Sequence, residues 1–200
     1  IIDVVGICNE ILEEYKVEEF SLLGFSFGTS IETLFASLTK AKLKKLVFVS
    51  PLITSQYGDD DKNVKLLARL YPLRPGGILK QYQSSRFKYV YSKVMLKNGL
   101  SAEFISEYAK LILNSSPKVL LQSLHFLFQN NYGYLINNFA KKPLLVINSR
   151  NENPMFRKNA ELLRIKSSNE KSIFLKGRHE DFILYPNPKV YNQIFSFLIA

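Results

Sequence analysis

Tryptophan is absent from this sequence of 200 residues, and cysteine and histidine are scarce, with one Cys and two His. A single cysteine, Cys8, excludes an internal disulfide framework and suits a reducing compartment, so we expect it to be a packed core thiol. No Cys, His or carboxylate residues cluster at the spacing of metal ligands. We therefore expect neither a metal nor an organic cofactor.

Long hydrophobic runs are also missing. The longest uncharged stretch near membrane length, residues 119–140, is interrupted by several Gln, His and Asn residues, so we predict no transmembrane segment. The chain starts at Ile1 in what reads as a helix already under way, without a basic n-region or a signal-type apolar run. We expect a piece of a longer protein, with a cytoplasmic location as the default.

Acidic residues are fewer than basic ones: the sequence has 17 Asp and Glu and 27 Lys and Arg, which gives a net charge of +10. The basic residues are scattered singly along the chain, which is typical of a solvated surface and not of a nucleic-acid-binding arm. We expect no nucleic-acid partner, while contact with a membrane surface stays open. The hydrophobic fraction of 46% is enough for a substantial core.

Hydrophobic periodicity predicts strands that alternate with helices, which indicates an α/β fold with a mostly parallel sheet. Between residues 52 and 138 the pattern becomes helical with Pro and Gly breaks, so we predict a helical cap inserted between two parts of a core, residues 1–51 and 139–200. The expected elements are helix 1–15, strand 20–24, helix 31–38, strand 45–50, strand 143–147, helix 155–165, strand 172–175 and helix 188–198.

Residues 24–28, Gly-Phe-Ser-Phe-Gly, match the pattern G-x-S-x-G between a predicted strand and a predicted helix. Such a sharp connection strains its middle residue, and we expect Gly24 and Gly28 to relieve the crowding. Ser26 is then pushed outward as a nucleophile, and the Phe27 amide at the helix terminus can stabilise an oxyanion. The alternative is an ordinary glycine-bounded turn with an inert serine.

A nucleophilic serine needs a base, and the chain offers two histidines. His125 lies on an apolar helical pattern in the predicted cap, where a structural role is the more common one. His179 follows the last predicted strand, at the carboxyl edge of the same sheet as Ser26. We therefore predict His179 as the base.

The base needs a carboxylate to orient it, and Glu152 follows the strand 143–147 through a short loop. The alternative is that Glu152 is a solvated charge near a helix start, because Asn153-Pro154 opens the next helical segment. Chain order favours the catalytic interpretation, since serine, acid and then histidine is the order that this strand-turn-helix nucleophile requires.

Together these segments resemble the α/β-hydrolase family, in particular its members with a helical cap. Residues 143–152, Pro-Leu-Leu-Val-Ile-Asn-Ser-Arg-Asn-Glu, are similar to the family pattern Pro-x-Leu-x-Ile-x-Gly-x-x-Asp, with Glu152 in the place of Asp. Some family members, cholinesterases among them, use a glutamate. Asp181 is the fallback acid, and Arg178, where the family often has Gly, puts a cation beside the imidazole.

The resemblance implies a serine hydrolase, carboxylesterase- or lipase-like, that acts on a small-molecule acyl or ester substrate through a Ser26–His179–Glu152 triad. It also implies that the family's first strands, and the loop that supplies the second oxyanion amide, precede Ile1. Two alternatives stay open, a ligand-binding relative with little or no turnover and an acyltransferase on the same fold.

Overall fold

The computed structural model describes the two ends of the chain and a few positions between them: residues 2–56, 131–177, 179, 181–184 and 186–199, with 102, 105, 106, 119 and 123. The chain divides into two compact units, one made of Ile1–Asp61 with Asn130–Ala200 and the other of Lys62–Gln129. The predicted cap falls largely outside the described residues and stays a prediction, while residues 52–56 and 131–138 belong to the first unit.

The strands and the longer helices alternate as the hydrophobic pattern predicts, with ends that shift by a few residues, whereas the short helices Gly133–Asn138 and Asp181–Leu184 are not among the expected elements. In chain order they are α1 (Ile2–Glu14), β1 (Glu19–Phe25), α2 (Gly28–Leu38), β2 (Lys42–Val49), the 3-10 helix η2 (Gly133–Asn138), β3 (Leu144–Ser149), α8 (Pro154–Lys166), β4 (Glu170–Leu175), α9 (Asp181–Leu184) and α10 (Pro188–Ile199). In the part of the chain that the structure describes, no helix has the length and apolar character to cross a membrane.

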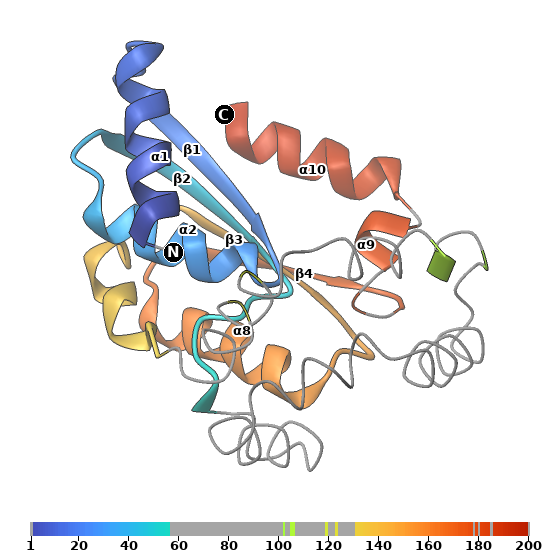
Figure 1. Ribbon diagram of the computed structural model, residues 1–200. Coiled ribbons are helices and arrows are strands. Elements are labelled where there is room, and N and C mark those ends of the chain that lie inside the picture. The colour runs from blue at the N-terminus through green and yellow to red at the C-terminus, as the bar shows by residue number, and fades with distance from the viewer. Residues whose placement is uncertain are drawn as a thin grey trace. The chain divides into compact units, whose positions relative to one another are not determined.

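The four strands form one parallel sheet in the order β1-β2-β3-β4 (Figure 1). The register pairs Phe25 with Val49, Val49 with Ile147, and Ser149 with Leu175, so the carboxyl ends of all four strands lie along one edge of the sheet. The expectation of a parallel α/β sheet is thus confirmed. Loops that leave this edge are brought close together, which is where an open α/β sheet builds its sites.

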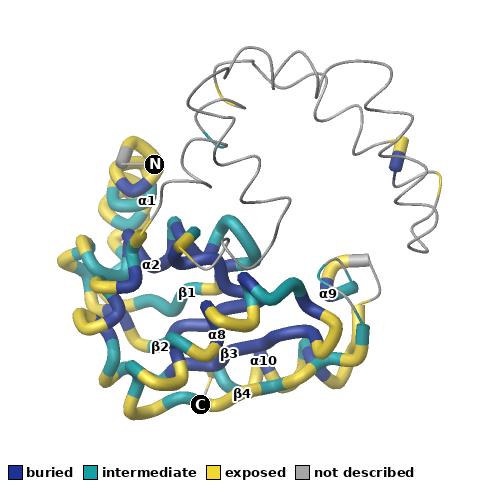
Figure 2. The backbone as a smooth tube through the Cα atoms, turned by 90° about the horizontal axis from the view of Figure 1, so that it is seen from below, coloured by how far each residue is buried: buried dark blue, intermediate teal, exposed yellow. Residues whose placement is uncertain are grey.

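Consecutive residues of the central strands are buried, as parallel sheets require, and Figure 2 colours these strands dark blue along much of their length. In β2, Leu46 and Phe48 face the core formed with η2 and α8, and Val47 and Val49 face the core formed with α10. The same alternation in β3 continues both cores. Helices on both faces therefore make β2 and β3 the rigid centre of this unit.

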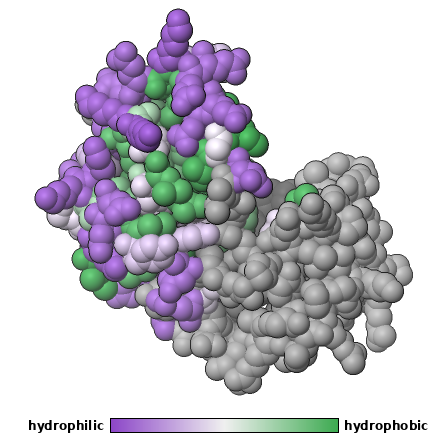
Figure 3. Space-filling model, turned by 60° about the vertical axis from the view of Figure 1, so that its left-hand side comes forward, coloured by the Kyte–Doolittle hydropathy of each residue, from purple (hydrophilic) through white to green (hydrophobic). Residues whose placement is uncertain are grey.

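Helix α1 carries two apolar lines and buries one of them against α2. Val5, Cys8 and Leu12 pack in a small cluster with α2, and Cys8 is only partly buried instead of being a core thiol. A second apolar line on the same helix is exposed: Val4, Ile7, Ile11 and Tyr15. In Figure 3, which turns the left-hand side of Figure 1 forward, hydrophobic residues gather on the described part of the surface with hydrophilic residues around them. The pattern could not separate the two lines because both follow helical spacing.

Candidate active site

The turn that joins β1 to α2 carries Ser26 in a rare backbone conformation. β1 ends at Phe25 and α2 begins at Gly28, so two residues make the whole connection. Ser26 has a φ of 51°, in the left-handed region that residues other than glycine seldom adopt. Its amide donates to the carbonyl oxygen of Val49 at 2.9 Å, which ties the turn to the end of β2. This turn presents Ser26 at the carboxyl edge of the sheet, next to a helix amino terminus.

The two glycines of the turn differ in how closely the chain approaches them. A Cβ on Gly24 would lie 2.4 Å from Oε2 of Glu32 and 3.0 Å from the carbonyl oxygen of Gly28. Apart from its chain neighbours and the backbone of its own helix, no atom of the described residues lies within 4 Å of the equivalent position on Gly28. The expectation that both glycines relieve crowding is therefore right for Gly24 and wrong for Gly28. The reason is that α2 crosses over Gly24, whereas Gly28 begins that helix at an open position.

This difference gives a matched pair of variants. We expect Gly24→Ala to lower the free energy of unfolding by about 1–3 kcal/mol, because the added methyl group would lie 2.4 Å from the Glu32 carboxyl group and only 3.0 Å from backbone atoms of α2. Gly28→Ala is expected to leave stability within about 1 kcal/mol or to raise it, because alanine favours the helix. Urea unfolding of both variants measures this, and equal destabilisation by the two would contradict the geometry.

His179 lies in the short connection between β4 and α9. Its side chain faces the turn around Ser26, residues 24–28, which we call the elbow. Its Nε2 is 2.8 Å from Oγ of Ser26, although the two residues are 153 positions apart in the chain. The imidazole contacts two aromatic rings, that of Phe25 with centroids 5.1 Å apart and that of Phe156 at 4.3 Å. About a fifth of the side chain is exposed to solvent. The ring is thus held by packing and still open on one side.

Glu152 lies on the other side of the imidazole, in the loop after β3. Its Oε1 is 3.0 Å from Nδ1 of His179, and its side chain is 1% exposed. The backbone amide of Asn153 donates to the same oxygen at 3.3 Å. The glutamate at the usual aspartate position therefore reaches the imidazole. A carboxylate at Nδ1 favours the tautomer in which Nε2 can accept a proton from Ser26.

Ser50 is a second partner of Glu152 that sequence reasoning missed. It follows β2 with a φ of 47°, is buried, and donates its hydroxyl to Oε2 of Glu152 at 2.7 Å. Its amide also donates to the carbonyl oxygen of Ile147 at 2.8 Å. The only available signal was its position, at the carboxyl end of a strand and directly before Pro51. Ser50 therefore completes the hydrogen bonding of a buried carboxylate.

Phe27 and Asp181 are the remaining predicted site residues that the structure describes. Phe27 precedes the first residue of α2, where amide groups at a helix amino terminus favour a negative charge. Asp181, the fallback acid, begins α9 with its carboxyl group against Gly177, and the carboxylate at the imidazole is that of Glu152. His125 and Arg178 lie outside the described residues. Among the residues that are described, no three His, Cys, Asp or Glu side chains converge as a metal site.

Glu32 is a buried carboxyl group beneath the elbow that no pattern in the sequence pointed out. It lies in α2, is 5% exposed, and approaches Gly24 closely. Burial raises the pKa of this carboxyl well above its ordinary value of 4.5, and the nearby backbone of Val47 and Gly24 lowers the pKa by less. Neither carboxyl oxygen reaches hydrogen-bond geometry with a described group. The fold therefore favours the protonated form of Glu32.

We expect Glu32→Gln to change how stability depends on pH. Above pH 4.5 the unfolded chain releases this proton while the folded chain retains it, so rising pH favours unfolding. Glutamine has nothing to release. The stability of the variant relative to the parent should rise by up to ~1.4 kcal/mol per pH unit until the pKa of the folded state is passed. Urea unfolding from pH 4.5 to 8 checks this, and a constant difference would contradict it.

Similarity to known proteins identifies the family of this chain. The alpha/beta hydrolase fold model matches residues 1–186. A comparison with curated proteins finds no significant match. Among solved structures, a bromoperoxidase from Bacillus anthracis is 17% identical with a TM-score of 0.71, and the alignment covers 98% of this chain and 73% of that one.

Two further structures agree in fold. A hydrolase from Oleispira antarctica has a TM-score of 0.75 at 14% identity, over 98% of this chain and 71% of that one. The esterase EaEST from Exiguobacterium antarcticum has a TM-score of 0.69 at 16% identity, over 98% and 72%. Identities this low support a shared fold alone, but the family model spans nearly the whole chain. The protein therefore belongs to the alpha/beta hydrolase fold family.

Proposed function

We propose that this protein is a serine hydrolase that cleaves an ester or related acyl bond through a covalent acyl-enzyme. One observation carries the proposal: Ser26, His179 and Glu152 form a continuous chain of contacts, with Oγ 2.8 Å from Nε2 and Nδ1 3.0 Å from the carboxylate. That arrangement allows a serine hydroxyl to be deprotonated as it attacks. Membership of the family, and the likeness in fold to an esterase, support the same chemistry.

In the first half of the reaction, Oγ of Ser26 attacks the carbonyl carbon as Nε2 of His179 takes the hydroxyl proton. The carbonyl oxygen becomes an oxyanion near the amino terminus of α2, and the Phe27 amide donates to it. The intermediate collapses as the carbon–oxygen bond to the leaving alcohol breaks, and Nε2 returns the proton to that oxygen. Glu152 stays ionised throughout and stabilises the imidazolium.

In the second half, water replaces the alcohol. His179 takes a proton from water, the hydroxide attacks the acyl carbon, and the bond to Ser26 breaks as the serine oxygen regains a proton. The products are a carboxylic acid and the free enzyme. An acyltransferase would differ only in this half, because an alcohol or amine would take the acyl group in place of water.

The second candidate is a ligand-binding relative in which the same residues recognise a small molecule with little turnover. Glu152 in the usual position of aspartate is the observation that favours it, since one additional methylene changes how the acid approaches the imidazole. Against it stands the contact between Glu152 and Nδ1 of His179, which already has hydrogen-bond length. We therefore rank hydrolysis first.

Covalent labelling with a fluorophosphonate probe separates the two candidates. We expect the folded protein to gain the mass of one phosphonyl group, located on Ser26 by peptide mass spectrometry, and protein unfolded in urea to gain none. Reaction of the folded state alone shows that the fold activates the serine. Absence of labelling in a sample with native circular dichroism would reject the hydrolase proposal and favour ligand binding.

Acyl transfer is tested by adding an alcohol during p-nitrophenyl acetate turnover. An acyltransferase would form a new ester between the acetyl group and that alcohol, whereas a hydrolase would release acetate.

A further inference from the structure

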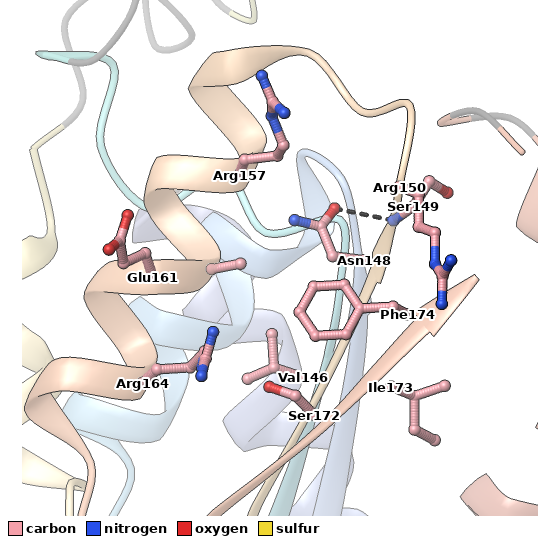
Figure 4. Close-up of a pocket in the computed structure, with 11 residues that line it drawn as sticks. Val146, Asn148, Ser149, Arg150, Arg157, Glu161, Arg164, Ser172, Ile173 and Phe174 are labelled. Atoms are coloured by element: carbon pink, nitrogen blue, oxygen red, sulfur yellow. Dashed lines mark hydrogen bonds between the residues drawn. The ribbon is translucent and has the colours of Figure 1, made fainter. Parts of the chain in front are cut away.

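A cavity separate from the proposed active site lies between α8 and the strands β3 and β4. Its volume is about 420 Å³, and neither Ser26 nor His179 lines it (Figure 4). Val146 of β3 and Ala160 of α8 contribute small apolar side chains to its lining. This cavity has no role in the reaction described above.

Three arginines surround this cavity. Arg157 and Arg164 are seven residues apart on α8, close to two full turns, so they lie on one face of the helix. Arg150 approaches from the loop after β3. None of the three guanidinium groups forms an ion pair with the described residues, including Glu161, the one acidic residue of the lining. The side chain of Glu161 points away from the cavity in Figure 4.

The remaining lining adds an amide donor and an exposed ring. Asn148 is 3% exposed, and its Oδ1 accepts from the amide of Ser149 at 3.0 Å. Its Nδ2 consequently points toward α8 and into the cavity (Figure 4). Phe174 is 54% exposed, and its ring lies between the arginines in the same view. Guanidinium groups beside an aromatic ring suit a ligand that carries a negatively charged oxygen group attached to a flat apolar group.

We propose that this cavity is a binding site for a small organic phosphate or phosphonate whose apolar part packs on Phe174. Three like charges around one cavity repel each other, and a dianion relieves this repulsion. The planar guanidinium groups donate pairs of hydrogen bonds to phosphate oxygens, a geometry that lysine does not offer. Asn148 adds a neutral donor from the wall. The site does not depend on the proposed hydrolase activity.

Phenylphosphonate is the probe, titrated calorimetrically into the full chain, with inorganic phosphate and benzyl alcohol as partial ligands. We expect Arg157→Gln/Arg164→Gln to weaken phenylphosphonate binding roughly tenfold or more. The control Lys158→Gln/Lys171→Gln removes two charges from the same helix and strand outside the lining, and it is expected to change affinity less than about twofold. Phe174→Ala should lower the preference for phenylphosphonate over inorganic phosphate and keep phosphate binding.

Three outcomes would overturn this site. Equal loss in the arginine and lysine variants would mean that general surface charge attracts the anion. Binding that disappears after Ser26 is blocked by the fluorophosphonate would locate the probe in the active site instead. Equal affinity for benzyl alcohol and phenylphosphonate would remove the role of the arginines. Circular dichroism on each variant shows that the fold is retained, and Phe174→Ala tests the ring with every charge in place.

Discussion

Ser26→Ala is expected to reduce ester turnover by about 10⁴-fold or more, because it removes the nucleophile and leaves the rest of the site intact. Alanine lacks the hydroxyl that lies 2.8 Å from Nε2 of His179, so the variant cannot form the acyl-enzyme on Ser26. The measurement is kcat/KM for p-nitrophenyl acetate hydrolysis, with burst-phase kinetics to detect the acyl-enzyme in the parent protein. The residual rate in the variant should have no burst.

A matched control for this variant is Ser168→Ala. Ser168 is exposed, and its hydroxyl makes one long contact, 3.4 Å to the carbonyl oxygen of Ala140. We expect full turnover from it. If Ser26→Ala kept more than a hundredth of the parent activity, the nucleophile would be another group, and the proposed mechanism would be wrong.

Glu152→Gln is expected to lower kcat by about 10²–10⁴-fold with little change in KM. The amide keeps the size of the side chain but loses the negative charge that stabilises the imidazolium. In the parent, Nδ1 of His179 and the hydroxyl of Ser50 both donate to the Glu152 carboxylate. The glutamine amide has one oxygen that accepts and one NH₂ group that donates, so one of these two neighbours would face another donor. The wrong tautomer of His179 then puts a proton on Nε2, which prevents it from accepting the serine proton.

Ser50→Ala is expected to lower kcat less than Glu152→Gln does. It keeps the carboxylate and removes one hydrogen bond to Oε2, so we expect a loss of about tenfold or less in kcat. Stopped-flow measurement of acylation on both variants separates this from product release. A Glu152→Gln variant with acylation as fast as the parent would show that Glu152 is a structural acid, and attention would turn to Asp181.

Most of the local architecture could be predicted from the sequence. The apolar runs and helical spacings located the four strands and the longer helices to within a few residues, since each depends on side chains that are close in the chain. Asn153-Pro154 was predicted to begin a helix, and Asn153 caps α8 by accepting from the Met155 amide at 2.9 Å. The conformation of the G-x-S-x-G turn is equally local. The positive φ of Ser26 and the close approach of the α2 backbone to Gly24 both involve residues within five positions of each other.

The partners of the site were harder to identify. Ser50 and Glu152 are 102 residues apart, and the bond between them exists only because β2 and β3 are neighbours in the sheet. The packed ring of Phe156 against His179 depends in the same way on how α8 crosses the strands. Spacing along the chain contains no information on such crossings.

The sequence by itself determined the alternation of strands and helices, the elbow around Ser26, and the order in which serine, acid and histidine occur. Tertiary structure alone decided which side of α1 is buried, that Gly24 and not Gly28 is crowded, that Ser50 supports Glu152, and that three arginines surround one cavity. The reason is physical: backbone preferences act between near neighbours, whereas burial and hydrogen bonding between distant side chains follow from the register of the sheet and the packing of helices on it.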